Sequence, residues 1–232
     1  MSSDAPHAVV TGSSSGIGRA IAESLLAAGW RVSGLDVSAA CIAHAEFSHM
    51  QVDLAQGAEI ARAAHSLGVP DALVHAAGVL RVGPLGQLDL AGGELMWRLH
   101  VDAATRLADA LVPGMAARGS GRVVFIGSRV AQGMPGRGQY AATKAALVAL
   151  ARSWAAEVAG QGVTVNVVSP AATATAMLQD PSRAASAPRL PPIGRLIAPA
   201  EIAGLVGYLL SPIAAAITGQ DIAVCGGSSL PR

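Results

Sequence analysis

Short apolar runs alternate along the chain with longer stretches of helical periodicity. The apolar runs are predicted strands, because each is short and bounded by glycine, proline or polar residues. They lie at His7–Thr11, Trp30–Leu35, His49–Val52, Asp71–His75, Arg122–Gly127, Val163–Ser169 and Asp221–Val224. Predicted helices lie between them, at Arg19–Ala28, Gln56–Leu67, Gly93–Arg118, Arg137–Gly160 and Pro199–Leu210. This alternation predicts an α/β fold, a doubly wound, Rossmann-like parallel sheet of about seven strands with helices on both faces.

Composition supports this fold class and indicates its size. The chain has 232 residues, of which 52% are hydrophobic, 13% are charged and only 3% are aromatic. A core of alanine, valine, leucine and isoleucine suits a parallel sheet that alanine-rich helices bury on both faces. Because no linker interrupts the alternation, residues 1–232 are expected to form a single domain.

Charge and cysteine usage argue against several classes of protein. The net charge is +1 and there is no basic tract, so neither nucleic acid nor a membrane surface is an expected partner. Cys41 and Cys225 are far apart and form no metal-binding or redox motif, so no metal site is expected. No apolar run approaches the ~18 residues of a membrane span, and the first residues lack a signal-peptide pattern. A cytoplasmic protein is expected.

A glycine-rich segment separates the first predicted strand from the first predicted helix. It reads Gly12-Ser-Ser-Ser-Gly16-Ile-Gly18. Glycine lets a backbone approach a pyrophosphate closely, and the N-terminus of a helix supplies free N–H groups and a partial positive charge. The position of the segment between a strand and a helix predicts a dinucleotide-binding loop.

The second predicted strand leads directly into Asp36. A carboxylate at this place can accept hydrogen bonds from both ribose hydroxyls of an adenosine, and it repels a 2′-phosphate. Neither Val37 nor Ser38 offers a positive charge to such a phosphate. The sequence therefore favours NAD over NADP as the cofactor, with a solvated strand-end aspartate as the alternative.

The segment from Gly127 to Lys144 carries the candidate chemistry. Tyr140 and Lys144 are four residues apart, so on a helix they share one face. An ammonium near a phenol favours the phenolate and lowers the pKa of the tyrosine, which then exchanges a proton near neutral pH. Ser128 follows a predicted strand and should present its hydroxyl at the edge where ligands bind. Such a Tyr–Lys spacing also occurs by chance on ordinary helix faces, so its interpretation depends on the other motifs.

Residues 171–198 differ in character from the rest of the chain. They are rich in proline, alanine, serine and threonine, and their periodicity is weak. A long loop in a compact domain usually serves a binding site, and this one leaves a predicted strand at the ligand edge. The segment is predicted to be a mobile substrate lid, with a plain surface loop as the alternative.

Together, these motifs resemble the short-chain dehydrogenase/reductase family over nearly the whole chain. The matching residues occur in the family's order: Thr11-Gly12-x-x-x-Gly16-Ile17-Gly18, Asp36, Asp53, Ala76-Ala77-Gly78, Ser128, Tyr140-x-x-x-Lys144, Asn166-Val-Val-Ser-Pro170, Thr175 and Ile217-Thr-Gly-Gln220.

The resemblance implies a role for the matched residues. Tyr140 would be the catalytic acid/base, Lys144 would lower its pKa and hold the nicotinamide ribose, and Ser128 would hydrogen-bond the substrate oxygen. Asp53 and Leu54 would flank the adenine. The full set of implied cofactor contacts is Gly12, Ser14, Ser15, Gly16, Ile17, Gly18, Asp36, Asp53, Leu54, Ala76, Ala77, Gly78, Tyr140, Lys144, Pro170, Ala171, Thr173 and Thr175.

Two departures from the family pattern lie near the implied catalytic residues. His75 stands where the family usually has asparagine, and Asp102, in Leu99-His-Val-Asp102, is aligned with a second usual asparagine. In the family, the main-chain carbonyl of that asparagine holds a water of a proton relay. Asp102 is therefore a candidate catalytic residue, and its carboxylate is expected to approach Lys144 and to raise the pKa of the ammonium. The alternative is a solvated helix residue that points away from the site.

The activity implied by the resemblance is NAD-dependent interconversion of a secondary alcohol and its ketone by hydride transfer, in a homotetramer. Some stretches are similar to 2,3-dihydro-2,3-dihydroxybenzoate dehydrogenases, so the alcohol could be a cyclic dihydrodiol with a carboxylate. Arg81 or Arg129 could pair with that carboxylate, with solvated arginines as the alternative. Two alternatives stay open. One is a non-catalytic NAD(H)-binding redox sensor, and the other is an NADPH-preferring ketoreductase such as a 3-oxoacyl reductase.

Overall fold

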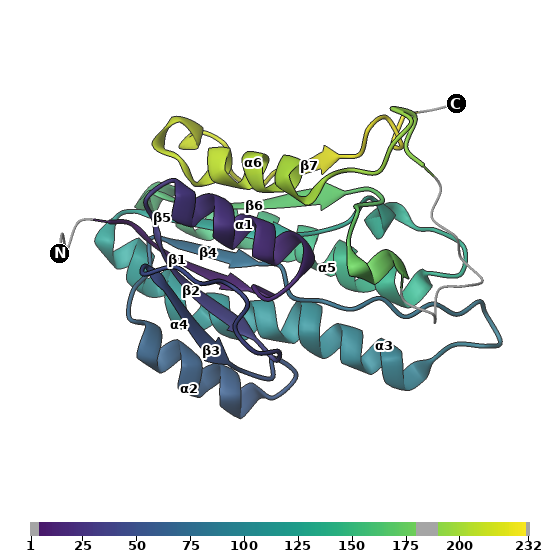
Figure 1. Ribbon diagram of the computed structural model, residues 1–232, viewed down its shortest axis with the longest axis horizontal. Coiled ribbons are helices and arrows are strands. Elements are labelled where there is room, and N and C mark those ends of the chain that lie inside the picture. The colour runs from purple at the N-terminus through teal and green to yellow at the C-terminus, as the bar shows by residue number, and fades with distance from the viewer. Residues whose placement is uncertain (1–4, 180–189, 231–232) are drawn as a thin grey trace.

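A seven-stranded parallel sheet runs through the middle of the protein (Figure 1). Its strands lie in the order β3-β2-β1-β4-β5-β6-β7. This computed structural model describes residues 5–179 and 190–230. The strands are β1 (His7–Thr11), β2 (Arg31–Asp36), β3 (Phe47–Gln51), β4 (Ala72–His75), β5 (Gly121–Ile126), β6 (Val163–Pro170) and β7 (Asp221–Val224).

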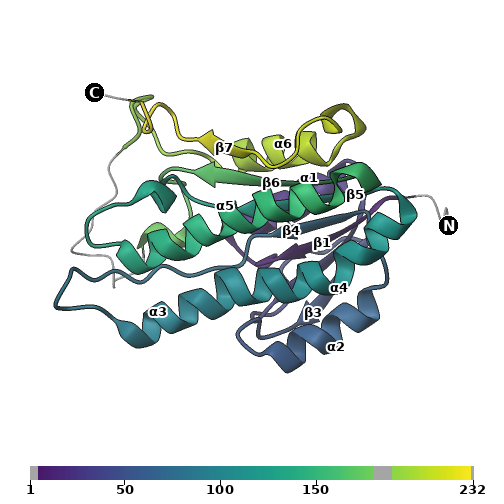
Figure 2. The ribbon, with the colours of Figure 1, turned by 180° about the vertical axis from the view of Figure 1, so that it is seen from behind.

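Helices cover both faces of the sheet. Helices α1 (Gly16–Ala27) and α6 (Pro199–Leu210) pack together on the face turned toward the viewer in Figure 1. Helices α2 (Gly57–Leu67), α4 (Ala103–Arg118) and α5 (Gly138–Val158) cover the opposite face, which Figure 2 brings to the front. Helix α3 (Leu90–Trp97) continues into α4 through the π-helix η1 (Arg98–Asp102). Short 3-10 turns complete the described elements: η2 (Arg129–Gln132), η3 (Ala159–Gln161), η4 (Ala176–Gln179) and η6 (Pro212–Ala214).

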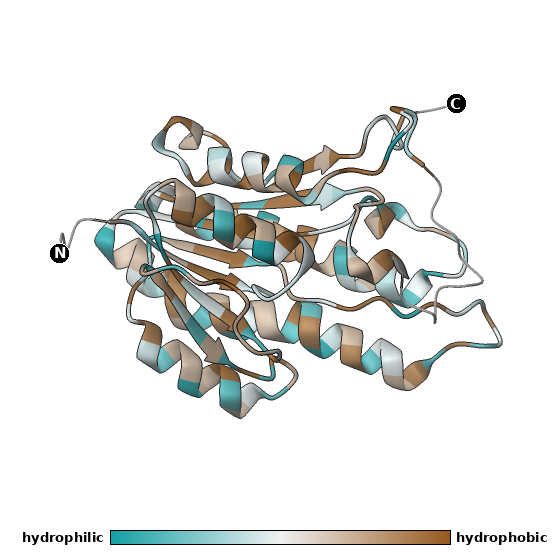
Figure 3. Cartoon of the chain, in the orientation of Figure 1, coloured by the Kyte–Doolittle hydropathy of each residue, from teal (hydrophilic) through white to brown (hydrophobic). Residues whose placement is uncertain are grey.

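The central strands are hydrophobic at nearly every position because helices bury both of their faces. Successive side chains of a strand point to opposite faces. Val9 therefore packs in the core beneath α2, α4 and α5, whereas Val10 packs in the core beneath α1 and α6. Leu73 lies in the same core as Val9, and Val74 lies in the same core as Val10. Coloured by hydropathy, the central strands are largely hydrophobic, whereas the helices alternate between hydrophobic and hydrophilic residues (Figure 3). The sequence therefore predicts the doubly wound sheet correctly.

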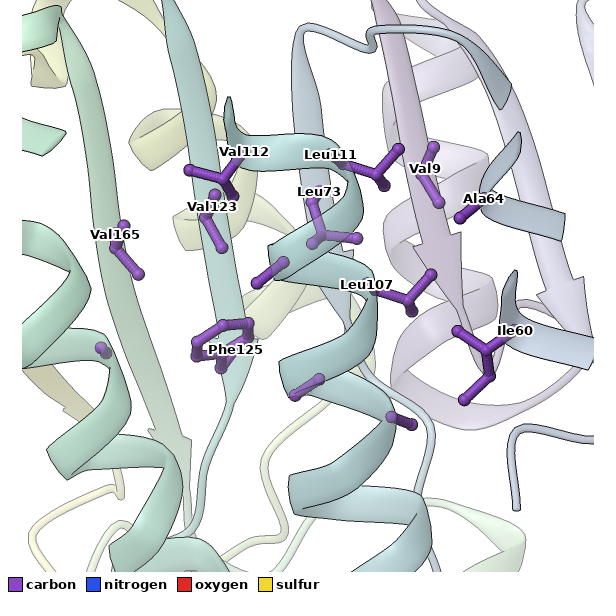
Figure 4. Packing of buried hydrophobic residues seen from close by; sticks show 14 of the residues in the cluster. Val9, Ile60, Ala64, Leu73, Leu107, Leu111, Val112, Val123, Phe125 and Val165 are labelled. Carbon is purple, nitrogen blue, oxygen red and sulfur yellow. The ribbon is translucent and has the colours of Figure 1, made fainter. Parts of the chain in front are cut away.

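The larger core packs α4 against the sheet (Figure 4). Leu107 and Leu111 of α4 belong to one buried cluster with Leu73 of β4 and Phe125 of β5, and all four residues are at most 2% exposed. The Phe125 ring also meets Trp154 edge-on, with ring centroids 5.9 Å apart. Truncating such a side chain to alanine typically costs about 2–5 kcal/mol, because a cavity remains. This packing gives the carboxyl ends of the strands a rigid base.

The predicted long helix Gly93–Arg118 is the element that differs most from expectation. Helical structure starts earlier, at Leu90, where the Asp89 side chain caps it by accepting a hydrogen bond from Gly92 N. The π-helix η1 then interrupts the regular spacing over Arg98–Asp102. Periodicity predicts the helix but not this change of phase, and the change decides which side chains face the site.

Membrane-spanning helices and metal-binding groups can be described only within residues 5–179 and 190–230. No helix in those ranges is both long and apolar enough to cross a membrane. The described residues also contain no group of three or more His, Cys, Asp or Glu side chains able to hold a metal ion. Cys41 and Cys225 are both free thiols.

Candidate active site

The carboxyl ends of the parallel strands open into one large cavity. The chain folds outward from β1 in both directions, with β2 on one side and β4 on the other. Ligands of open α/β sheets bind at such a switch point. Segments that follow β1, β2, β4, β5 and β6 line a cavity of about 1040 Å³. Small-molecule sites typically measure ~300–1,000 Å³, so this cavity can hold a large ligand.

The glycine loop after β1 lies close to main chain on two sides. Gly12 has a φ of +69°, and a Cβ at this position would lie 2.9 Å from Cα of Ala77. Gly18 lies so close to the carbonyl of Gly12 that no Cβ fits between them. Without these side chains, the first turn of α1 faces the cavity and offers its free N–H groups to an anion. The residues of this turn that line the cavity are Ser15, Gly16, Ile17 and Gly18.

Asp36 lies at one end of the cavity and is held by two main-chain donors. Its Oδ2 accepts from Ser14 N at 2.9 Å, and its Oδ1 accepts from Ser38 N at 2.8 Å. Only 8% of Asp36 is exposed, and the residue lines the cavity. Each carboxylate oxygen retains a lone pair for one further donor. The carboxylate is therefore oriented and still able to bind a pair of hydroxyl groups.

Asp53 and Leu54 line the same end of the cavity, after β3. The Asp53 carboxylate accepts a hydrogen bond from Ala55 N at 2.9 Å, and the main-chain N–H of Asp53 donates to Glu59 at 2.8 Å. These bonds fix the turn that leads into α2. Asp53 and Leu54 therefore form a defined wall beside Asp36.

The loop after β4 is organised by Thr11 and His75. Thr11 Oγ1 accepts from the main-chain N–H groups of Ala76 and Ala77, both at 3.0 Å. With both lone pairs used, the Thr11 hydroxyl donates its proton to His75 Nδ1, 3.0 Å away. His75 therefore carries its proton on Nε2 and donates to the carbonyl of Leu99 at 3.0 Å. Burial is the largest cause that lowers the pKa of His75 to about 3, so the imidazole is neutral.

Ser128, Tyr140 and Lys144 meet at the other end of the cavity. Lys144 Nζ lies 5.7 Å from the centre of the Tyr140 ring and donates to the carbonyl of Ile126 at 2.9 Å. Ser128 Oγ accepts from Val130 N at 3.2 Å, which leaves the hydroxyl proton available to a ligand. Burial lowers the pKa of Lys144 to about 7. A proton donor, a cation and a phenol therefore share one small region of the wall.

His100 connects the β4 loop to the catalytic helix. Val79 N donates to His100 Nε2 at 3.1 Å, so the proton of the neutral ring lies on Nδ1. His100 Nδ1 donates to Thr143 Oγ1 at 2.8 Å, and the Thr143 hydroxyl donates to the carbonyl of Tyr140 at 2.8 Å. The His100 ring also packs edge-on against the Tyr140 ring, with centroids 5.6 Å apart. Burial lowers the pKa of His100 well below its ordinary value, so it stays neutral.

The segment after β6 forms one side of the cavity opening. Pro170, Ala171, Thr173 and Thr175 all line the cavity. A Cβ on Gly16 would lie 3.4 Å from the methyl carbon of Thr175, so this segment lies beside the glycine loop. The central part of the predicted lid, residues 180–189, is outside the described residues.

Comparison with known proteins agrees with this geometry. A family model described as enoyl-(acyl carrier protein) reductase matches residues 12–229. A solved structure of a short chain dehydrogenase/reductase family protein superimposes with a TM-score of 0.89 at 36% identity, covering 98% of each chain. The chain belongs to the short-chain dehydrogenase/reductase family.

Characterised relatives of this short-chain dehydrogenase/reductase act on different compounds. A 3-oxoacyl-(acyl-carrier-protein) reductase of Salmonella typhimurium is 36% identical, over 98% of this chain and 98% of the relative. A 2,3-dihydro-2,3-dihydroxybenzoate dehydrogenase of Escherichia coli is 35% identical, over 95% of this chain and 96% of the relative. The chain is therefore an oxidoreductase of a family that uses nicotinamide cofactors.

The fold brings nearly all sequence-predicted site residues of this short-chain dehydrogenase/reductase to one cavity. Ser14 is the exception among the implied cofactor contacts. It lies behind the wall, where its N–H orients Asp36 and its hydroxyl donates to the carbonyl of Ala39 at 3.0 Å. Gly78 lines the cavity next to His100, which leaves no room for a larger residue there.

The expectation that the Asp102 carboxylate approaches Lys144 is wrong. Its carboxylate does not approach Lys144: Oδ2 accepts a hydrogen bond from Arg106 Nε at 2.9 Å, and the Asp102 side chain is 39% exposed. Only burial perturbs the pKa of Lys144. The π-helix rotates Asp102 outward and turns His100, two residues earlier, into the cavity.

His100 and Thr143 are the site residues that sequence reasoning missed. His100 stood in the quoted segment Leu99-His-Val-Asp102, and Thr143 stood directly before Lys144. A polar residue at each position was visible in the sequence. Their hydrogen bonding depends on the phase of the π-helix, for which the sequence offered no signal.

Proposed function

We propose that this protein is an NAD-dependent oxidoreductase that interconverts a secondary alcohol and its ketone. The observation that carries the proposal is that Ser128, Tyr140 and Lys144 line the same cavity as the glycine loop and Asp36. A phosphate-binding loop and a proton-transferring group are the two parts that such a reaction needs from the protein. The family membership of the chain supports the same chemistry.

The cavity fits a nicotinamide dinucleotide. The first turn of α1 would bind the pyrophosphate, Asp36 the ribose hydroxyls of the adenosine, and Asp53 and Leu54 the adenine. Lys144 would hold the ribose of the nicotinamide, with Thr173 and Thr175 near its carboxamide. When bound, the nicotinamide accepts or supplies the hydride.

The protein side chains handle the proton. During oxidation the Tyr140 phenolate oxygen takes the proton of the substrate hydroxyl, while a bound nicotinamide would accept the hydride of the carbinol carbon, which leaves a carbonyl. Ser128 Oγ donates a hydrogen bond to the substrate oxygen throughout. The Lys144 ammonium stabilises the phenolate, because it is held nearby in a region from which water is largely excluded. Reduction follows the same path in reverse.

NAD is the proposed cofactor because of the carboxylate of Asp36. It is largely buried and fixed by two N–H groups, so it cannot turn away from a 2′-phosphate without breaking those bonds. Two like charges ~4 Å apart repel by about 1 kcal/mol in water and by several where water is partly excluded.

The substrate class rests on the relatives as well as on the site. A cyclic dihydrodiol is proposed because of the dihydrodiol dehydrogenase relative. Reduction of a 3-oxoacyl thioester is a second candidate, favoured by the 36% identity to a 3-oxoacyl reductase. A non-catalytic redox sensor has less support, because such a protein would not need a proton-transfer site.

In this proposal the protein acts in the cytoplasm as a single domain, and residues 171–198 form a lid over the substrate. Met177 and Leu178, which precede residues 180–189, and Leu190, which follows them, line the cavity. The two ends of the segment are joined by main-chain hydrogen bonds, from Ala174 N to the carbonyl of Ile197 at 2.9 Å and from Ile197 N to that of Ala172 at 3.0 Å. Such fixed ends would suit a covering loop.

A substrate screen tests the proposal. Secondary alcohols, cyclic dihydrodiols, ketones and 3-oxoacyl thioesters are offered with NAD or NADH, and absorbance of NADH is followed. Turnover of at least one alcohol–ketone pair is expected. Tight NADH binding without turnover of any compound in the panel would instead favour the redox sensor.

A further inference from the structure

The charges that line the cavity are separated by sign. Asp36 and Asp53 lie at the end assigned to the adenosine. At the catalytic end the charged residues are Arg129, Arg137 and Lys144, and no Asp or Glu lines that end among the described residues. A cavity lined by one sign of charge attracts ligands of the opposite sign. The catalytic end is therefore suited to an anion.

Arg129 is the cation whose surroundings most clearly require a ligand. It directly follows Ser128 and lines the cavity in a half-buried position. Its Nε is buried and lacks a hydrogen-bond partner, and the guanidinium forms no ion pair within residues 5–179 and 190–230. The arginines that do have acidic partners in the described structure are Arg19, Arg98, Arg106, Arg118 and Arg195.

Withdrawing a guanidinium from water without a partner is unfavourable, whereas pairing it with an oxyanion restores the lost interactions. The planar fork of arginine matches a carboxylate or phosphate with two parallel hydrogen bonds. Arg81, the other arginine that the sequence suggested for this role, is not among the residues lining the cavity; its Nη1 donates to the carbonyl of Leu80.

We propose that the substrate carries an oxyanionic group, a carboxylate or phosphate, and that Arg129 binds it while Ser128 and Tyr140 hold the reacting oxygen. This inference rests on the proposed function. It names the substrate class of the same site and the residue that selects it. The cofactor is a less suitable source of the anion, because its pyrophosphate belongs at the first turn of α1, and Arg129 stands on the segment after β5.

Apart from Arg137, Lys144 and the polar groups of Ser128 and Tyr140, the substrate end is largely apolar. Leu80, Leu95, Leu99, Val130, Met134 and Pro135 line it. An apolar wall gives little discrimination between substrates of similar shape, but a charged group without a partner discriminates strongly. The fitting substrate is therefore a secondary alcohol with an apolar body and one anionic group.

Three cyclic alcohols of similar shape test this inference. They are 4-hydroxycyclohexanecarboxylate, its uncharged carboxamide and cyclohexanol, each oxidised with NAD by the full-length protein. We expect kcat/KM for the carboxylate to exceed that for the carboxamide by about 10- to 100-fold, as for a charge-assisted hydrogen-bonded pair. Equal kcat/KM for the carboxylate and the carboxamide would overturn the inference and leave the proposed function intact.

Substitution of Arg129 identifies the residue responsible. Arg129→Gln should lower kcat/KM for the carboxylate by about 10- to 100-fold, mainly by raising KM. The same substitution should change kcat/KM for the carboxamide by less than about threefold. Arg129→Lys should recover part of the loss, because it restores the charge but not the fork. Arg62→Gln, the same change at an exposed position on α2, is the matched control.

A binding measurement separates this inference from the proposed function. Calorimetry of the carboxylate with the protein–NADH complex does not require turnover. Arg129-dependent binding without turnover would support the inference and contradict the proposed function. Equal losses of kcat/KM for the carboxylate and the carboxamide in Arg129→Gln would overturn the inference, because Arg129 would then have a structural role. Weaker binding of NADH by the same variant would also overturn it, because Arg129 would then act on the cofactor.

Discussion

At the scale of single residues, Lys144 places an ammonium in a largely buried position, with only 5% of the residue exposed. Burial lowers its pKa from 10.5 to about 7 in the folded protein. Between these values the unfolded chain binds more protons than the folded one, so the contribution of Lys144 to the free energy of unfolding rises with pH. Below about pH 7 both states are protonated, and the folded state bears the full cost of the buried charge.

Lys144→Met should therefore be more stable than wild type by a margin that depends on pH. The margin in free energy of unfolding is expected to be largest near pH 6 and to shrink as pH rises toward 10, because wild type then loses the buried charge on its own. Urea unfolding of both proteins without cofactor at several pH values measures it. A margin that stays constant over this range would show that Lys144 titrates normally.

Asp36 should determine the choice of cofactor. Wild type is expected to prefer NAD over NADP by roughly tenfold to several hundredfold in kcat/KM, from the repulsion of a 2′-phosphate. Asp36→Asn removes the charge but keeps the shape, so the preference should narrow toward unity. Asp109→Asn, which removes a charge from the exposed side of α4, should leave the preference unchanged. Equal efficiency of wild type with the two cofactors would contradict this role.

At the scale of elements, the π-helix between α3 and α4 determines which side chain reaches the catalytic helix. His100 accepts from Val79 N and donates to Thr143, so its removal leaves Val79 N–H without this partner, whereas the Thr143 hydroxyl keeps its bond to the carbonyl of Tyr140. Asp102 lies on the outer side and pairs with Arg106. The two positions should therefore respond differently to substitution.

His100→Leu should lower kcat by about tenfold or more while KM changes less, because Tyr140 loses the network that positions its helix turn. It should also destabilise the protein by about 1–3 kcal/mol for the unsatisfied N–H of Val79. Asp102→Asn is the matched control and should leave both kcat and its pH profile unchanged. A shift of that profile in Asp102→Asn, with no effect in His100→Leu, would restore the original expectation for Asp102.

Most elements around the π-helix can be predicted from the sequence, but the π-helix itself cannot. The strands are predictable because their residues are apolar on both faces, and the spacing of Tyr140 and Lys144 predicts their shared helix face. The glycine loop and Asp36 follow from their places after β1 and β2. The inward turn of His100 is not predictable by such rules, because one π-helical turn changes the phase of every later side chain. Tautomers such as that of His75 follow only from a complete set of hydrogen bonds.

At the scale of the whole molecule, the outer face of α5 is unusually small and apolar. Ala142, Ala145 and Ala149 are exposed on this helix. Small side chains allow close packing of a second copy, and symmetric homo-oligomers are the usual form of soluble assemblies. We propose a homotetramer, which is also what the family resemblance implies.

Light scattering should therefore give a mass of about four times the 23.1 kDa chain at micromolar concentration. Ala149→Glu places a carboxylate on the outer face of α5 and should shift the mass toward smaller species. Arg62→Gln, at an exposed position on α2, serves as a control for surface substitution. A monomeric wild type would contradict the proposed assembly without affecting the account of the active site.

The most direct test of the central claim concerns the proton on Tyr140. Tyr140→Phe keeps the shape of the ring but cannot transfer a proton, so NADH should bind with wild-type affinity while alcohol oxidation falls by about 10²-fold or more. Fluorescence titration of NADH and steady-state formation of NADH, on the same preparation and on the substrate that the screen identifies, give both numbers. Near-normal turnover of Tyr140→Phe would contradict the assignment of Tyr140 as the acid/base.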